Sequence, residues 1–154
     1  MQFEQAVEII LKNEGGLVDH PQDPGGVTNF GISLKAYPQL GREGIINMTA
    51  SQAKEIYRRD YWDKLQCDKL PGMVRLGVFD FAVNSGVSQA VKTLQKVVGT
   101  TPDGVIGPKT INAAWTTKDV PINYAKERMR FYGKLTLFAT FGLGWSLRVL
   151  ETLA

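Results

Sequence analysis

The sequence predicts an α+β fold that is mainly α-helical and carries one small β hairpin. Apolar residues recur at helical spacing along most of the chain, which is typical of amphipathic helices packed around a common core. Residues 17–32 break this pattern with short alternating pieces between prolines and glycines, and this change predicts the hairpin. No long linker or internal repeat divides the 154 residues, so we expect a single domain over residues 1–154.

The first predicted helix ends at a glutamate in an unusual place. Its apolar positions follow the spacing of one buried face: Phe3, Ala6, Val7, Ile10 and Leu11. Gly15 and Gly16 end the helix, because glycine readily adopts the left-handed conformation found at helix ends. Glu14 therefore lies on the last turn, where the helix dipole disfavours a carboxylate. We expect the dipole and partial burial to keep this side chain protonated, as a general acid requires.

The predicted hairpin holds the densest polar chemistry in the sequence. Prolines and glycines exclude a helix here and favour a tight, preformed loop. These turn residues are Pro21, Pro24, Gly25 and Gly26. Asp23 lies within the loop and Thr28 follows it, while Phe30 and Ile32 alternate with a glycine, as in a short, half-buried strand.

Helix signals resume after the hairpin. Ser33 is expected to cap a brief helix that ends before Pro38. A second strong helix is expected to begin at Thr49, with Gln52 completing a capping box. Residues 74–82 are apolar on nearly every side, which predicts a central buried helix.

The second half of the chain is predicted to be helical throughout. Ser88 is expected to cap a helix that runs to Val98, and a proline in the first turn begins the helix over residues 108–115. Residues 119–154 are expected to form one or two closing helices, interrupted near the glycines at positions 142 and 144.

The residues around the hairpin have the chemistry that glycosidic bond cleavage needs. An inverting hydrolase uses one protonated carboxyl to protonate the leaving oxygen and a second carboxylate to activate water from the opposite face. Glu14 fits the acid and Asp23, in an exposed turn, fits the base, with the Thr28 hydroxyl orienting the same water. The alternative is that Asp23 forms only an Asx-turn and Thr28 only a hydrogen bond within the strand.

The stretch from Glu14 to Ile32, EGGLVDHPQDPGGVTNFGI, resembles the opening motif of the glycoside hydrolase family 108 muramidases. These are peptidoglycan-degrading enzymes common in phages and bacteria. Similar blocks follow along the chain: YRRDYWDKLQCDKLP at 57–71, FDFAVNSG at 79–86, LQKVVGTTPDGVIGPKT at 94–110 and GW at 144–145. The resemblance covers nearly the whole chain and implies a lysozyme-like helical domain.

The resemblance also implies roles for individual residues. The glutamate of the EGG motif, which is Glu14 here, is the family's proposed catalytic acid. Phage-type lysozymes place a glutamate, an aspartate and a threonine across a helix end and a hairpin, and their first step of nine residues is the step from Glu14 to Asp23. Their second step is one residue longer than the step from Asp23 to Thr28. Residues 87–154 resemble the family's predicted peptidoglycan-binding segment, which we expect to pack onto the catalytic part.

Residues outside the hairpin are candidates for contacts with the glycan. Asn84, at the end of the central helix, is expected to hydrogen-bond an N-acetyl group, although an asparagine before Ser-Gly is also an ordinary helix terminator. Phe30 is the second candidate for substrate binding. Asp80 lies on the same apolar helix as Asn84, and we expect it to be a satisfied buried acceptor instead of a second catalytic acid.

The sequence predicts no cofactor and no metal site. His20 is the only histidine, and one histidine in a turn makes a poor metal site. Cys67 is the only cysteine, so it has no disulfide partner within the chain, and we expect a half-buried structural thiol. The three tryptophans lie in apolar helical patterns and are expected to pack in the core. They are Trp62, Trp115 and Trp145.

The resulting prediction is a muramidase that cleaves the β-1,4 bond between N-acetylmuramic acid and N-acetylglucosamine, with the peptidoglycan glycan strand as its partner. Two alternatives remain at this stage. One is a lytic transglycosylase, which would use Glu14 alone, and the other is a non-catalytic peptidoglycan-binding or structural module of a phage tail or secretion device.

Charge and apolar segments indicate which partners and which cellular location to expect. A net charge of +3, from 18 basic and 15 acidic residues, does not indicate nucleic-acid binding. No signal-like segment is found at the N-terminus, and the apolar stretch over 135–147 is too short to cross a bilayer. We expect a monomer that stays in the host cytoplasm until it is released to the cell wall or periplasm, as for a phage endolysin with a holin; a secreted effector fits equally.

Overall fold

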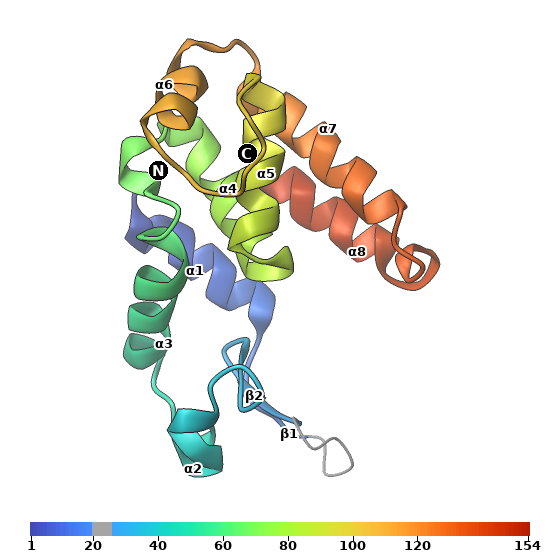
Figure 1. Cartoon of the computed structure of the whole chain (residues 1–154). Helices are drawn as coiled ribbons and strands as arrows, with labels where there is room; N and C mark the ends of the chain where they lie inside the picture. The colour runs from blue at the N-terminus through green and yellow to red at the C-terminus, as the bar shows by residue number, and fades with distance from the viewer. Residues whose placement is uncertain (20–25) are drawn as a thin grey trace.

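The computed structural model describes residues 1–19 and 26–154 and is mainly helical (Figure 1). Within these residues it has eight α-helices: α1 Phe3–Glu14, α2 Gly41–Ile46, α3 Ala50–Tyr57, α4 Gly72–Ser85, α5 Val87–Val98, α6 Pro108–Thr116, α7 Val120–Gly133 and α8 Phe138–Glu151. The strands are β1 Val18–Asp19, β2 Val27–Asn29 and β3 Ile32–Ser33. Shorter turns of helix are η1 Pro38–Leu40, η2 Arg58–Trp62 and η3 Cys67–Lys69. The predicted α+β, lysozyme-like fold is confirmed.

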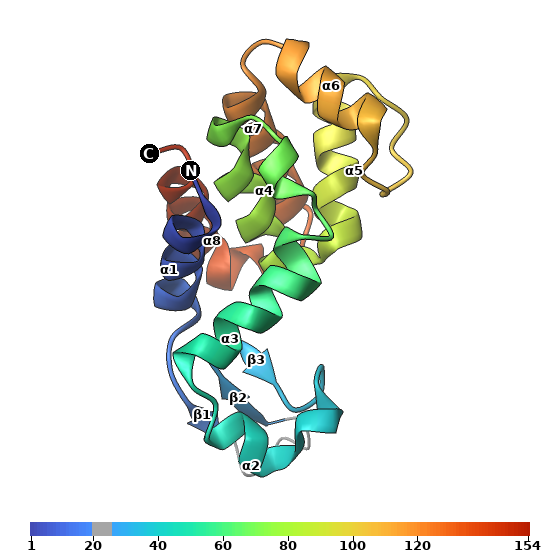
Figure 2. The ribbon, with the colours of Figure 1, turned by 90° about the vertical axis from the view of Figure 1, so that its left-hand side faces the viewer.

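The sheet and the larger group of helices lie at opposite ends of the molecule. The three strands and α2 form the lower part of Figure 2, and helices α4 to α7 form the upper part. Helix α3 leads from one part to the other, and α1 runs down to the sheet from the side of α8. Glu14, the last residue of α1, therefore lies where the helical part meets the sheet.

The core is organised around α4, as the sequence predicts. This helix is apolar on nearly every side and buries seven residues, including Phe79 and Phe81. Phe79 meets the rings of Phe3 and Trp62 at centroid distances of 6.2 and 5.3 Å, which joins α1 and η2 to the same cluster. Helix α4 also packs on α5 and α7.

The first helix begins and ends where local signals place it, and the helix after position 49 begins where they place it. Helix α1 buries Phe3, Ala6, Val7 and Ile10 and stops at Gly15, whose φ is +78°. Thr49 caps α3 through a complete capping box with Gln52. Helix α3 then continues into η2, a π-helical turn.

The hairpin region contains three strands instead of the two that a single hairpin would need. They pair antiparallel in the order β1-β2-β3, with Val18 opposite Thr28 and Asn29 opposite Ile32. Phe30 and Gly31 form the two-residue connection between β2 and β3, and both have positive φ, at +51° and +77°. His20 and Asp23 lie outside the described residues.

Several predicted helix boundaries are wrong. Ser33 accepts a hydrogen bond from the Ala36 amide, but no helix follows it before Pro38; α2, which the sequence analysis did not predict, begins at Gly41. Helix α5 begins at Val87, one residue before the predicted cap.

The closing part of the chain consists of two helices, but their break lies elsewhere than predicted. Helices α7 and α8 are separated by residues 134–137. Gly142 and Gly144 lie inside α8. None of the helices in the described parts of the chain combines the length and hydropathy needed to span a bilayer.

The tryptophans divide between buried and exposed positions. Trp62 is fully buried, and Trp145 stacks on Tyr132 at 5.0 Å between ring centroids. Trp115 contradicts the prediction, because it is 61% exposed, with its indole NH donating to the Lys69 carbonyl. Cys67 is fully buried, more than the half-buried position expected, and this burial raises the pKa of its thiol.

Candidate active site around Glu14

The stem of Glu14 lies against the backbone of the β2–β3 turn. A Cβ added to Gly31 would lie 2.8 Å from both Cβ and Cγ of Glu14, closer than carbon atoms pack. The same Cβ would lie 2.6 Å from the Tyr57 hydroxyl oxygen. Only glycine fits this contact, and the turn therefore fixes one side of the glutamate.

Tyr57 of α3 holds the turn in place. Its hydroxyl donates a 2.8 Å hydrogen bond to the Phe30 carbonyl. Burial raises the pKa of Tyr57, with a further contribution from the charge of Glu14, so the phenol stays a neutral donor. The hydrogen bond offsets part of the strain that a positive φ imposes on Phe30.

The carboxyl of Glu14 is paired with an arginine. Nη2 of Arg148, on α8, donates to Glu14 Oε1 at 2.6 Å across a sequence separation of 134 residues. The two side chains are 21% and 16% exposed, so the pair lies at the edge of solvent. Among the residues that the structure describes, no donor contacts Oε2, which leaves this oxygen open.

Asp80 lies between two arginines behind this pair. Its Oδ1 accepts from Arg148 Nε at 2.8 Å, and its Oδ2 accepts from Arg128 Nη2 at 2.5 Å. The Asp80 side chain is 1% exposed. The expectation that Asp80 is a satisfied buried acceptor is confirmed.

Arg128 extends the contacts to the candidate substrate residue Asn84. Its Nε donates to the Tyr132 hydroxyl at 3.0 Å, and that hydroxyl donates to Asn84 Oδ1 at 2.7 Å. The fully buried guanidinium also lies 5.0 Å from the centroid of the Phe81 ring and 5.5 Å from that of Tyr132. A continuous series of polar contacts thus joins Glu14 to Asn84.

The other predicted site residues occupy different surroundings. Asn84 is exposed, and its Oδ1 also accepts from Ser85; within the described chain its amide NH2 donates to no acceptor. Thr28 lies in the middle of β2, half-buried between buried neighbours. Asn29 is structural, because its amide donates to the carbonyls of Ile45 and Ile46 and so joins β2 to α2.

Sequence reasoning missed Arg148 and Tyr57 as neighbours of Glu14. The sequence does contain an indication of the role of Arg148, because it is the one cation in the otherwise largely apolar helix Phe138–Glu151. A lone arginine among apolar residues is expected to have a buried anionic partner. Sequence alone did not identify which carboxylates these were.

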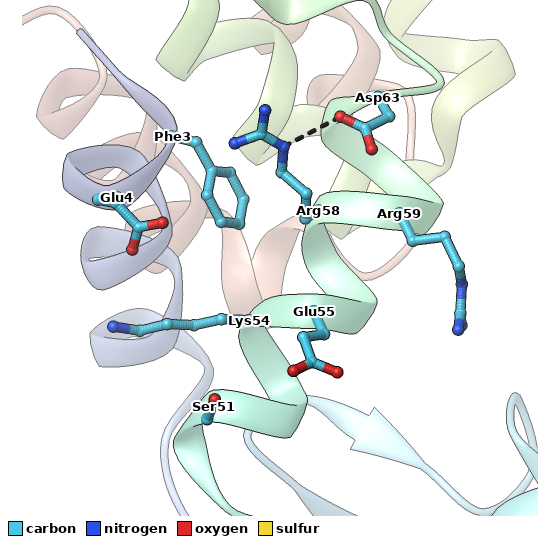
Figure 3. Close-up of a pocket in the computed structure, with 8 residues that line it drawn as sticks. All are labelled: Phe3, Glu4, Ser51, Lys54, Glu55, Arg58, Arg59 and Asp63. Carbon is cyan, nitrogen blue, oxygen red and sulfur yellow. Dashed lines mark hydrogen bonds and ion pairs between the residues drawn. The ribbon is translucent and has the colours of Figure 1, made fainter.

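The hollow shown in Figure 3 is a separate feature. It has a volume of about 610 Å³ and lies between the first turn of α1 and the α3–η2 segment, with Phe3, Lys54 and Arg58 among its lining residues. Arg58 pairs with Asp63 (Figure 3). Lys54 pairs with Glu8 of α1. Glu14 does not line it. Over the described ranges, no group of three or more His, Cys, Asp or Glu side chains is placed to hold a metal ion.

Comparison with known proteins identifies the family. The sequence model of the family described as glycosyl hydrolase 108 matches residues 7–86. The solved structure of SagA from Brucella abortus is 40% identical, with a TM-score of 0.87, over 98% of this chain and 91% of that one. The chain belongs to the glycosyl hydrolase 108 family. The comparison with curated proteins found no match.

Membership of the glycosyl hydrolase 108 family supports a peptidoglycan-degrading glycosidase. Glu14 lies inside the region that the family model matches, as do Thr28 and Asn84. Arg148 lies outside that region.

Proposed function

We propose that this glycosyl hydrolase 108 protein is an N-acetylmuramidase that cleaves the β-1,4 bond between N-acetylmuramic acid and N-acetylglucosamine. Glu14 is the general acid, and Asp23 with Thr28 positions the attacking water. The observation that carries the proposal is the placement of Glu14: a partly exposed carboxyl, fixed at the end of α1 against a stiff turn, with one oxygen open.

The chemistry assigned to Glu14 is a single proton transfer. The proton leaves Oε2 for the glycosidic oxygen as the bond between that oxygen and the anomeric carbon breaks, and the bonding pair stays with the oxygen. Water adds to the anomeric carbon and gives its proton to Asp23. The products are two shorter glycan strands, one of which has a new reducing end.

Two further residues are proposed to hold the glycan. The amide NH2 of Asn84 is oriented by hydrogen bonds to its own carbonyl oxygen, which suits donation to the carbonyl of an N-acetyl group. Phe30 offers an aromatic ring on a turn that is fixed beside Glu14. The backbone of Phe30 has a strained positive φ, and residues with such backbone strain cluster at functional sites.

The proposed setting is that of an endolysin. The protein would act as a monomer, remain in the host cytoplasm until a holin opens the membrane, and then reach the wall or periplasm. The family match supports this setting only through the substrate, because a peptidoglycan-degrading glycosidase acts on the cell wall.

Glu14→Gln is the test of the proposed function. The amide keeps the size of the side chain but carries no transferable proton, so lysis of purified peptidoglycan should fall by roughly 10²–10⁴-fold. Glu4→Gln is the matched control, since Glu4 is exposed on the same helix, and it should lyse at the parent rate. Both variants should sediment with peptidoglycan as the parent does.

Product analysis separates the remaining alternatives. Mass spectrometry of the digest should find reducing-end sugars as the main products. Anhydro-muropeptides would instead identify a lytic transglycosylase that uses Glu14 alone. Equal lysis by Glu14→Gln and the parent would refute the role of Glu14, and binding without any cleavage by the parent would identify a non-catalytic module.

A further inference from the structure

We propose that Asp80 is a positioning residue for the reaction, acting through Arg148. In this arrangement Asp80 and Arg128 fix the guanidinium of Arg148, and Arg148 holds Glu14 so that its open oxygen carries the proton. The inference rests on the proposed role of Glu14 as the acid and extends it to a buried ionic cluster. We define the acid-support cluster as Arg148, Asp80 and Arg128.

The contact between Arg148 and Glu14 engages one oxygen only. Nη2 donates to Oε1, while the neighbouring Nε of the same guanidinium is turned toward Asp80. A carboxyl whose Oε1 accepts a charged hydrogen bond keeps its proton on the other oxygen, Oε2. Single-oxygen pairing therefore determines which atom of Glu14 presents the proton.

Arg148 also favours the product of the proton transfer. With Glu14 protonated, the two arginines and Asp80 give a local charge of +1. After the proton has left, Glu14 and Asp80 balance Arg148 and Arg128, and the local charge is zero. The negative charge that develops on Glu14 forms 2.6 Å from a preplaced cation, the arrangement by which enzymes stabilise developing charge.

Asp80 is needed because Arg148 is otherwise weakly held. Arginine has a long, flexible side chain, and an ion pair at the edge of solvent contributes little by itself. The second hydrogen bond, from Nε to a carboxylate that is 1% exposed, restricts the guanidinium to one orientation. A misplacement of about 1 Å at a reacting group can cost about a hundredfold in rate.

Arg128 makes the buried carboxylate tolerable. Asp80 is taken out of water almost completely, and an unpaired charge in that position would be strongly unfavourable. Arg128 compensates Asp80 from the side opposite Arg148 and is itself stabilised by the Phe81 and Tyr132 rings. The cluster is thereby fixed to α4, which carries Asp80, and to α7, which carries Arg128.

The first experiment measures the rate of peptidoglycan cleavage by Arg148→Ala. We expect the apparent kcat to fall by roughly tenfold to a hundredfold, with an apparent KM within about twofold of the parent. Addition of about 20 mM guanidinium, far below denaturing concentrations, should restore part of the lost kcat by occupying the vacated place between the two carboxylates. Arg130→Ala is the control, because Arg130 pairs with Glu127 at the surface of α7. This variant should keep the parent kcat, and added guanidinium should not change it.

The second experiment tests Asp80 itself. Asp80→Asn should lower kcat by a similar factor, whereas Glu127→Gln, which also removes a carboxylate paired with two cations, should not. Asp80→Asn leaves Arg128 uncompensated and can unfold the protein, so the double variant Asp80→Asn with Arg128→Gln is measured beside it. The double variant removes both buried charges together and should show the same loss of kcat.

The outcomes distinguish this inference from the proposed function. Activity in Glu14→Gln would overturn the proposed function. An inactive Glu14→Gln, together with a parent-like kcat in Arg148→Ala or in the folded Asp80 variants, would overturn the positioning role alone. A loss that appears only in KM, or one that guanidinium does not relieve in Arg148→Ala, would also overturn it.

Discussion

Gly31→Ala is expected to lower stability and activity together, because position 31 is where the hairpin backbone meets the candidate acid. The new methyl group would lie 2.6 Å from the Tyr57 hydroxyl oxygen and 2.8 Å from the stem of Glu14. Both contacts are shorter than packed atoms tolerate, so Tyr57 and Glu14 must move. Each movement costs free energy, because the Tyr57 hydroxyl donates a hydrogen bond to the Phe30 carbonyl and the Glu14 carboxylate accepts one from Arg148.

The expected cost has two parts. An alanine at a φ of +77° costs about 1–2 kcal/mol in backbone strain, and overpacking a filled site costs about 1–3 kcal/mol. A sum near 3 kcal/mol is a large share of the roughly 5–15 kcal/mol that stabilises a domain. For a chain of this size it corresponds to a fall in Tm of about 6–12 °C.

Gly99→Ala is the matched control for this measurement. Gly99 has nearly the same φ, +75°, but a Cβ there has no atom within 4 Å. The control therefore carries the backbone strain without the clash and should lose only about 1–2 kcal/mol. Its activity should equal that of the parent.

Urea unfolding followed by circular dichroism measures the stability difference between the two variants, and peptidoglycan lysis measures the activity difference. Gly31→Ala should be less stable than Gly99→Ala by at least about 1 kcal/mol and should lyse at least about tenfold more slowly. Equal stability and equal lysis in the two variants would refute the close packing of the turn on Glu14.

Three other substitutions test further parts of the structure. Tyr132→Phe removes the hydroxyl that orients Asn84 and should cost about 1–3 kcal/mol in urea unfolding while weakening cosedimentation with peptidoglycan; unchanged binding would argue against a role for Asn84 in the glycan site. The Lys96 hydrogen bond holds the pKa of Glu127 below its ordinary value of 4.5, so this pairing stabilises the fold at neutral pH and is lost as the pH falls below that value. Between about pH 6 and about pH 3, Glu127→Gln should therefore lose less stability than the parent, and an identical acid dependence in the two proteins would contradict this. Trp115→Ala should cost less than about 1 kcal/mol, because the ring is 61% exposed, and a larger loss of Tm would show that the ring is packed more tightly than its exposure implies.

Helices with strong local signals were predictable from the sequence. The spacing of Phe3, Ala6, Val7 and Ile10 marks the buried face of α1, and Thr49 with Gln52 marks the start of α3. In each case residues within one or two turns determine the outcome, so no knowledge of the rest of the fold is needed.

Short elements were not predictable in the same way. Strand β1 has two residues and exists because it pairs with β2, and α2 has six residues and is joined to the sheet by Asn29. Gly142 and Gly144 suggest a break, yet α8 continues through both because its packing on α7 outweighs their low helix propensity. Contacts with distant parts of the chain determine whether such elements form, and a local sequence pattern carries no information about those contacts.

In the candidate site, too, the local feature was predictable from the sequence and the long-range contact was not. Glu14 stands out locally, as a carboxylate at the wrong end of a helix dipole followed by two glycines. Its arginine partner is a long-range contact, and no periodicity connects positions 14 and 148. The interpretation of Asp80 as a satisfied acceptor was correct because a carboxylate on an apolar helix needs a cation, although the sequence did not identify which cations.

The pairing of Glu14 with Arg148 has a consequence for the order of events during synthesis. Arg148 is added to the growing chain 134 residues after Glu14, so the acid has no cation beside it until α8 has left the ribosome. Parts of a chain that are made first can fold first, and the sheet, α1 and α3 can come together while α8 is still missing. A nascent chain can therefore display the hairpin and its glutamate before the arginine that completes the site has been translated.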